Sequence, residues 1–261
     1  MDILQRNRLY HWQADSRIDS LAAYFLGKPY VAATLESEDG VERLCINLRE
    51  VDCLTLVENV LALDSLLDEQ EENCDTNRQC LQRFPQWIER LRYRDGRMDG
   101  YCSRLHYTSD WILENERKGL LQQQTARFSD ALFCPKLHFM SSHPQLYKAL
   151  RLQPELLPKI EANEQALQGV CFHYIPKEKV AACADRIPSG YVVAITTDSP
   201  GLDFAHLGFT CRVDGELHLL HASSTAKKVV ISSQTLSDYL LGIKHVTVLC
   251  CCRLSIKKRI A

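Results

Sequence analysis

No long apolar run occurs anywhere in the sequence. Nothing approaches the roughly 18 consecutive apolar residues that a membrane-spanning helix requires. The opening residues, MDILQRNRLYHW, also lack the apolar core of a secretory signal peptide. We therefore expect a soluble protein without a membrane span, and we expect no targeting signal in the sequence as it stands.

Basic residues are not in surplus. The 31 Lys and Arg residues are balanced by 33 Asp and Glu residues, which gives a formal net charge of -2. The cationic clusters are short, at residues 227–228 and 257–259, and each is typical of a solvated strand end. Because nucleic-acid binding calls for a strongly basic face, we expect no nucleic-acid partner.

Several catalytic and metal-binding signatures are also missing. None of the 12 cysteines forms a C-x-x-C pair, and the adjacent cysteines 250–252 cannot all serve one tetrahedral metal site or one disulfide framework. We expect no metal, and we expect most cysteines to be small buried hydrophobic residues, a usage more typical of a reducing compartment. The absence of a Gly-x-Ser-x-Gly segment disfavours a serine hydrolase.

The pattern of the chain is helical first and stranded second. Helices are predicted over 18–27, from 53 onward, and near 77–93 and 145–168, with one early strand at 43–48. From 190 onward, strands are predicted over 190–197, 206–213, 216–223, 227–232 and 245–256. This order predicts an α+β fold with a mainly antiparallel sheet, in a single domain over 1–261 with an elaboration over about 68–168.

One cysteine stands at a predicted helix start. The apolar residues after Cys53 recur at helical spacing, and Asp52 is a suitable N-cap. A helix N-terminus and a nearby imidazolium can lower a thiol pKa into roughly the 3.5–7.5 range. Cys53 is therefore the candidate nucleophile.

A tight hairpin fixes the relative positions of two histidines. The Asp214-Gly215 pair between alternating strands predicts a two-residue turn, which sets Gly208 opposite His221. His206 and His221 then project from one face as diagonal neighbours, with room left by Gly208 between them. This arrangement suits a general base and the residue that orients it, whereas His218 points to the other face and is predicted to be structural.

Five segments of the chain resemble the N-acetylmuramoyl-L-alanine amidase-like family of bacterial cysteine hydrolases, a family related to the NlpC-type, papain-fold peptidoglycan peptidases. They run in order from about residue 18 to 232: GKPYVAATLE, NLREVDCLTLVE, SRLHYTSDWI, PGLDFAHLGF and LHLLHASS. The resemblance implies a papain-like (NlpC-type) α+β fold in which the nucleophile helix packs on the sheet. It also implies that Cys53 is the nucleophile, His206 the base and His221 the third, polar member of the site.

The resemblance also implies a substrate-binding set. Tyr30 would lie beside the nucleophile with its hydroxyl near the substrate, next to Asp52. The segment 103–112 would be a family-specific insertion that walls the cleft with side chains suited to a sugar or lactyl ether, namely Arg104, His106, Tyr107, Asp110 and Trp111. Tyr107 and Trp111 could equally be core aromatic residues.

The implied activity is hydrolysis of the amide between N-acetylmuramic acid and L-alanine in peptidoglycan fragments, through a thioester acyl-enzyme and without a metal or organic cofactor. Alternatives are a peptide-stem endopeptidase, an effector acting on a non-murein amide, and a catalytically weak glycan-binding module, which Leu54 after the nucleophile favours. The family implies muropeptides as partners and the cell envelope or periplasm as location, while the free-cysteine usage also fits a cytoplasmic or translocated protein. The sequence does not indicate an oligomeric state.

Overall fold

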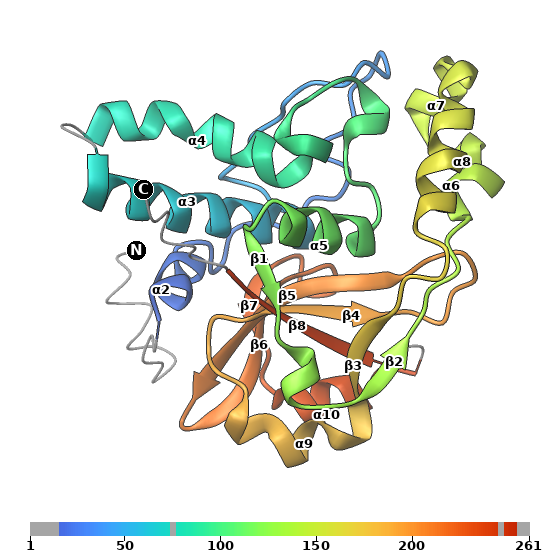
Figure 1. Cartoon of the computed structure of the whole chain (residues 1–261). Helices are drawn as coiled ribbons and strands as arrows, with labels where there is room; N and C mark the ends of the chain where they lie inside the picture. The colour runs from blue at the N-terminus through green and yellow to red at the C-terminus, as the bar shows by residue number, and fades with distance from the viewer. Residues whose placement is uncertain (1–15, 74–76, 245–247, 255–261) are drawn as a thin grey trace.

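The sheet and its flanking helices form the body of the molecule in the computed structural model, which describes residues 16–73, 77–244 and 248–254. The helices, shown in Figure 1, are α2 (Arg17–Ala23), α3 (Cys53–Asn73), α4 (Asn77–Arg92), α5 (Thr108–Arg117), α6 (Phe139–Ser142), α7 (Lys148–Leu152), α8 (Leu157–Ala166), α9 (Val180–Cys183) and α10 (Leu236–Leu241). The strands are β1 (Leu121–Gln123), β2 (Ala131–Phe133), β3 (Phe172–Pro176), β4 (Val192–Thr196), β5 (Phe204–Val213), β6 (Glu216–Ser223), β7 (Lys228–Ile231) and β8 (Val248–Leu254).

The strands form one antiparallel sheet. Its order is β2-β3-β8-β4-β5-β6-β7, and β1 also pairs with β8. The prediction of an α+β fold with a mainly antiparallel sheet is therefore confirmed. The predicted final strand, 245–256, is described over 248–254, and its remaining residues lie outside the described part of the chain.

Helices cover both faces of the sheet (Figure 1). Residues of α2, α3, α4 and α5 form one buried cluster with a sheet face that includes Phe209 and Leu220. Residues of α9 and α10 form a second cluster with the opposite face, which includes Val193 and Leu219. The alternation of the central strands between two apolar clusters explains why their sequences are almost continuously apolar.

The predicted hairpin is present in the predicted register. Asp214 and Gly215 both have positive φ, 51° and 88°, as a type I′ turn requires. Val213 pairs with Glu216, and the register continues without a shift to the pair of Phe209 and Leu220. The face assignment of the β5 and β6 side chains is therefore confirmed.

An irregularity interrupts the pairing of β5 with β4 at the start of β5. Ile195 pairs with His206, but the next residue, Thr196, pairs with Phe204, so Ala205 is an extra residue in β5. Phe204 and Leu207 consequently belong to the same apolar cluster although three positions separate them. Such a β-bulge changes which face the side chains on its two sides take, and here it separates Phe204 from His206.

The prediction of a strand over 43–48 is wrong. The segment forms neither strand nor helix. Its backbone carbonyl groups accept hydrogen bonds from side chains, where those of a strand would accept them from the backbone of a neighbouring strand. The carbonyl oxygens of residues 45, 47 and 48 accept hydrogen bonds at 2.5, 3.0 and 2.6 Å from Arg92, Asn59 and Lys28. Alternation of apolar residues cannot distinguish this extended loop from a strand, because the distinction lies in the hydrogen-bond partner.

The single helix predicted over 145–168 is broken into α7 and α8. Pro154 begins a short 3₁₀ turn between them, and a further proline, Pro158, lies in the first turn of α8. Proline lacks the N–H that an interior helix position needs and disfavours helical backbone in the residue before it. The predicted helix over 77–93 is confirmed as α4.

The elaboration expected over 68–168 divides into two parts. Ile88 of α4 and Trp111 of α5 are buried in the main apolar cluster, and β1 and β2 join the sheet. A separate, smaller cluster holds α6, α7 and α8, around Met140, Leu150 and Ile160. These three helices stand together beside the sheet in Figure 1, and we call residues 139–166 the helical module.

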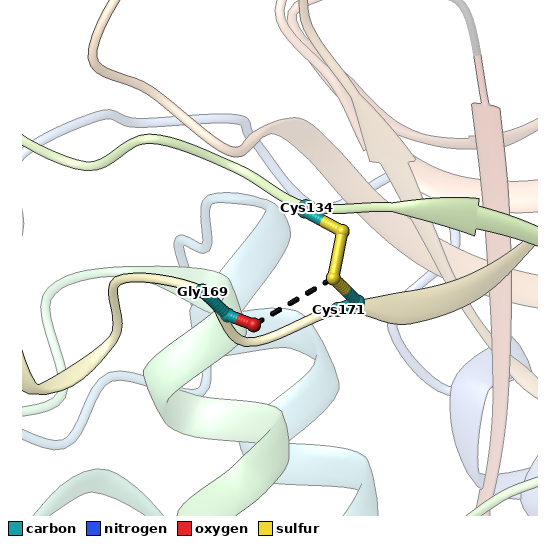
Figure 2. The surroundings of a disulfide bond; sticks show 3 residues. All are labelled: Cys134, Gly169 and Cys171. Carbon is teal, nitrogen blue, oxygen red and sulfur yellow. Dashed lines mark hydrogen bonds between the residues drawn. A yellow bond between two sulfur atoms is a disulfide. The ribbon is translucent and has the colours of Figure 1, made fainter.

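A disulfide joins the two chain segments that lead into and out of the helical module. Cys134, after β2, bonds to Cys171, before β3, with 4.2 Å between the Cα atoms (Figure 2). Both cysteines are exposed, so the expectation that cysteines here are buried hydrophobic residues is wrong for this pair. It holds for Cys102, Cys183 and Cys211, which are buried and free.

Among residues 16–73, 77–244 and 248–254, no helix combines the length and the apolar character needed to cross a bilayer.

Candidate active site

The helix that carries Cys53 begins with a reciprocal cap. The Asp52 carboxylate accepts a hydrogen bond from the Thr55 N–H at 2.8 Å, and the Thr55 hydroxyl accepts one from the Asp52 N–H at 2.9 Å. This is the geometry of a capping box, and the predicted N-cap is confirmed. Cys53 is thereby fixed as the first residue of α3, where backbone N–H groups remain free of intrahelical partners.

Tyr30 lies beside the cysteine because backbone bridges hold its segment on two sides. Tyr30 bridges Val51, and Pro29 bridges Lys228 at the start of β7. Burial raises the pKa of the Tyr30 hydroxyl, and its nearness to the Cys53 thiol and the Asp52 carboxylate raises it further. The phenol is therefore a proton donor at neutral pH, next to the thiol.

His206 and His221 are directly hydrogen bonded. Nε2 of His206 lies 2.7 Å from Nδ1 of His221, with the ring planes at 85°. A Cβ added to Gly208 would lie 2.8 Å from the Leu220 carbonyl oxygen and 3.0 Å from the His221 Cβ, so only glycine leaves room for this pairing. The predicted pairing of the two histidines on one face is present.

The helix and the histidine pair meet at the start of β5. The backbone N–H of Leu207, the residue after His206, lies close enough to the Cys53 thiol to lower its pKa. No hydrogen bond joins the thiol directly to the His206 ring within the described residues. In enzymes without bound substrate such bonds are often long and tighten only when substrate binds.

The protonation states differ from those expected from the sequence. Burial raises the pKa of Cys53 to about 12, with the Asp52 carboxylate as the second cause, and these outweigh the opposing N–H groups of Leu207 and Leu54. Burial lowers the pKa of His206 to about 4. The predicted low thiol pKa is wrong, because removal from water favours the neutral form of both groups more than the helix N-terminus favours the thiolate.

Hydrogen bonding determines which tautomer of the histidine pair can act. If His206 accepts a proton at Nδ1, both of its ring nitrogens carry hydrogen, and Nε2 must donate to His221. Nδ1 of His221 then has to be the unprotonated nitrogen of a neutral ring. Burial, together with the charge of His206, lowers the pKa of His221 to about 3, which keeps that ring neutral.

An aromatic side chain that sequence analysis did not select completes the surroundings of His221. The Tyr239 ring of α10 lies 5.3 Å from the His221 ring, at 71°. His221 itself is 3% exposed. No local signal identifies Tyr239, because the contact joins β6 to a short helix that follows β7.

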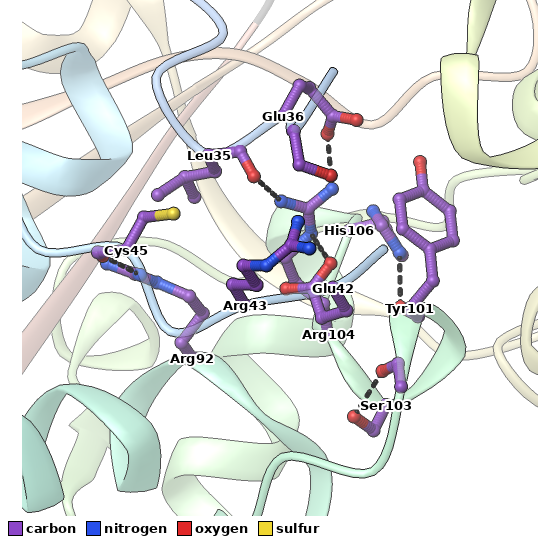
Figure 3. Close-up of polar contacts among 12 residues, drawn as sticks. Leu35, Glu36, Glu42, Arg43, Cys45, Arg92, Tyr101, Ser103, Arg104 and His106 are labelled. Carbon is purple, nitrogen blue, oxygen red and sulfur yellow. Dashed lines mark hydrogen bonds and ion pairs between the residues drawn. The ribbon is translucent and has the colours of Figure 1, made fainter. Parts of the chain in front are cut away.

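Arg104 and His106 are engaged in internal contacts and do not line the cysteine. Arg104 is 5% exposed, pairs with Glu36 and lies 3.7 Å from the Glu42 carboxylate (Figure 3). Nε2 of His106 lies 2.9 Å from the Tyr101 carbonyl oxygen. Arg104 therefore anchors the loop of residues 34–46, and its contact with substrate stays a prediction.

The other side chains of this segment are also buried. Tyr107 donates a hydrogen bond of 2.6 Å to Glu164 of the helical module, and Asp110 pairs with Arg94 at 2.5 Å. Trp111 has no exposed surface and belongs to the main core. Side chains buried in this way stabilise the segment, and the structure does not bring them to an exposed surface beside Cys53, so their contact with substrate stays a prediction.

A cavity of about 310 Å³ lies next to the first turns of α3. It is lined by the loop and helix residues Thr34, Leu35, Cys45, Ile46, Asn47, Thr55, Asn59 and Arg92. Cys53 and the two histidines do not line it. Thr55 and Asn59 project from the side of α3 turned away from Cys53, so the cavity is distinct from the candidate active site.

Comparisons with known proteins place the chain among amidase-like proteins. The profile described as N-acetylmuramoyl-L-alanine amidase-like matches residues 20–247. The crystal structure of an N-acetylmuramoyl-L-alanine amidase from Bacteroides uniformis is 41% identical, with a TM-score of 0.81, over 93% of this chain and 100% of that one. A candidate xylanase from Bacteroides fragilis is also 41% identical, with a TM-score of 0.81, over 90% of this chain and 100% of that one.

A more distant structure shares the fold. A protein from Legionella pneumophila is 24% identical, with a TM-score of 0.66, over 97% of this chain and 94% of that one. No curated protein sequence matches the chain.

Proposed function

This chain belongs to the N-acetylmuramoyl-L-alanine amidase-like family, and on that premise we propose that it is a papain-like cysteine amidase that cuts between N-acetylmuramic acid and L-alanine in peptidoglycan fragments. The observation that carries the proposal is the hydrogen-bonded pair of His206 and His221 beside the helix start at Cys53. A nucleophile, a base and a residue that orients the base are the parts that covalent acyl transfer needs.

In the proposed mechanism His206 acts on a neutral thiol. Nδ1 of His206 takes the Sγ proton as Cys53 attacks the amide carbonyl, and His221 stabilises the resulting imidazolium through its Nδ1. Backbone N–H groups at the start of α3 and the Tyr30 hydroxyl stabilise the oxyanion. His206 then protonates the departing amine of L-alanine, and water hydrolyses the thioester between Cys53 and the lactyl group.

The name of the Bacteroides fragilis relative raises a second class, glycoside hydrolysis. That reaction commonly uses two carboxyl groups about 5–9.5 Å apart on either side of the scissile bond. The carboxyl group next to Cys53 is that of Asp52, and its Oδ1 already accepts hydrogen bonds from the N–H and the hydroxyl of Thr55. The geometry around the histidine pair therefore favours acyl transfer.

The identity of the products tests the proposal. Purified muramyl peptides incubated with the protein are expected to give the free sugar and a peptide that begins with L-alanine, as measured by mass spectrometry. Fragments cut between D-glutamate and the third stem residue would assign an endopeptidase instead. Shortened glycan chains would assign a glycosidase, and an unchanged mixture would point to a non-murein amide or to a binding module.

The protonation states predict an unusual pH profile. Because the pKa of His206 is about 4, kcat/KM is expected to rise as the pH increases through about 4 and to stay flat from pH 5 to 8. An unperturbed histidine would place this rise near 6.5. Because the pKa of Cys53 is about 12, alkylation of its thiol by iodoacetamide should stay slow up to pH 8.

Stability has to be followed in the same experiment. A buried histidine whose pKa is lowered by folding loses stability as the pH falls below its unfolded value near 6.5, because only the unfolded chain then takes up the proton. Circular dichroism at each pH separates unfolding from loss of the base. An acid limb near pH 6.5 in folded protein, or a thiol that titrates near neutrality, would contradict the assigned protonation states.

A further inference from the structure

A buried carboxylate lies three residues before His206. Asp203 is 2% exposed and sits between β4 and β5. Its Oδ2 accepts hydrogen bonds from both the N–H and the hydroxyl of Ser109, each at 2.7 Å. Its Oδ1 accepts the Phe204 N–H, also at 2.7 Å. Both carboxylate oxygens are thus engaged, and neither points to open solvent.

Asp203 caps a helix that is remote from it in the sequence. Tyr107, at the N-cap position of α5, makes no capping hydrogen bond with its side chain, and Ser109 is the second residue of the helix. The N–H of Ser109 is one of the donors that a helix start leaves without an intrahelical partner. A carboxylate at this point also interacts favourably with the helix dipole. The hydrogen bonds from Ser109 to the Asp203 carboxyl group therefore attach the start of β5 to the N-terminus of α5.

The attachment lies at the bulge next to His206. Asp203 precedes Phe204, and Ala205 is the extra residue that reverses the alternation of side chains between Phe204 and His206. The carbonyl oxygen of Asp203 also accepts the Thr197 N–H at 3.0 Å, across the mouth of the loop between β4 and β5. The chain is thus fixed immediately before the bulge, and the regular ladder with β6 fixes it after the bulge.

The loop is also held from the other side. The Gly201 carbonyl oxygen accepts the N–H groups of His138 and Phe139 at 3.3 and 3.2 Å, where the helical module begins. Gly201 has a φ of 81°, and an added Cβ would lie 3.0 Å from the His138 ring, so the approach requires glycine. These contacts support the loop, but Asp203 makes the one buried charged contact in it.

We propose that Asp203 is a positioning residue for the base, which keeps the bulge closed so that His206 faces Cys53 and His221. The inference rests on the proposed function. It assigns the α5 segment a role in catalysis through its helix N-terminus, in place of the direct substrate contact expected from the sequence.

The first test separates positioning from binding. Asp203→Ala is expected to lower kcat on muramyl peptides by roughly 10- to 100-fold with KM changed less than about threefold, because a shift of about 1 Å in a catalytic group can cost that much. Asp203→Asn keeps one carbonyl oxygen for Ser109 and should recover part of the lost kcat. Ser109→Ala removes one donor of two and should be milder than Asp203→Ala.

A matched control accounts for lost stability. Asp64 is a second buried carboxylate, 3% exposed, which pairs with Arg17 at 2.5 Å in the middle of α3, about three turns from Cys53. Asp64→Ala should lower Tm to a similar extent as Asp203→Ala and leave kcat within about twofold, since it lies roughly 16 Å along the helix from Cys53. Equal losses of kcat in the two variants at equal loss of Tm would overturn the proposal.

A substrate-independent measurement separates this inference from the proposed function. Although slow in the wild-type protein, the rate of Cys53 alkylation by iodoacetamide at pH 7 is expected to be slower still in His206→Ala, because the base then no longer takes the thiol proton, and to fall toward the same value in Asp203→Ala. If muramyl peptides are not cut at all, the amidase proposal fails while this comparison still decides the role of Asp203. An alkylation rate that Asp203→Ala leaves unchanged overturns the positioning role whatever the substrate.

Discussion

Replacing Cys53 with alanine is expected to abolish hydrolysis while leaving the fold intact. Loss of the nucleophile from a catalytic set that acts as a unit typically costs at least about 10³-fold in kcat. The half-buried side chain contributes little to the core, so Tm should change only slightly. Cys53→Ser should be almost as inactive, because a hydroxyl is a weaker acid and a poorer nucleophile than a thiol.

Cys45 provides the matched control for this substitution. It is also free and half-buried, and it lines the cavity on the opposite side of α3. Cys45→Ala should keep full activity on muramyl peptides, measured by product release. More than about a tenth of wild-type activity in Cys53→Ala would remove Cys53 from the role of nucleophile, since no triad member is that dispensable.

The second large effect is expected at the histidine pair. His206→Ala should lower kcat nearly as much as Cys53→Ala, because the thiol stays protonated and the leaving amine receives no proton. His221→Gln should keep measurable activity, since a side-chain oxygen can still accept the hydrogen bond from Nε2 of His206. His221→Leu, which offers no acceptor, should be clearly worse than His221→Gln.

His218 is the control for the histidine substitutions. It lies on the same strand as His221 but faces the other way, and its Nδ1 is 2.9 Å from the Ser232 carbonyl oxygen. His218→Ala should change kcat by less than about threefold, because the residue makes a structural hydrogen bond away from the histidine pair and its loss should mainly lower stability. An essential His218 with a dispensable His221 would contradict the assignment of roles.

Local sequence signals predicted the parts of the site that depend on neighbouring residues. The Asp214-Gly215 turn was sufficient to set the register of β5 and β6, because type I′ turns tolerate few residues and the strands alternate strictly beyond them. The capping box at Asp52 and Thr55 is likewise a contact between residues three positions apart. Such contacts are available to sequence reasoning because chain geometry alone brings the partners together.

Contacts between distant segments were not predictable in the same way. The loop of residues 43–48 alternates like a strand, and only the positions of Arg92 and Lys28 explain why side chains take its carbonyl groups. Trp111 and Arg104 carry chemistry suited to a sugar, but the fold buries both. The pKa of Cys53 depends on how much water the assembled sheet and helix exclude, which no local pattern reports.

The bulge at Ala205 makes the site depend on a residue count as well as on residue identity. Ala205 is exposed, and its side chain is not required for the pairing of the two histidines, so many residues could replace it. Deletion of the same residue would restore a regular strand and turn Phe204 and Asp203 toward the wrong faces of the sheet, because the hairpin holds His206 in register with β6. Relatives of this chain can therefore be sorted by spacing: a homologue with both histidines but one residue fewer between the counterparts of Asp203 and His206 would retain the histidine pair without the attachment of Asp203 to α5.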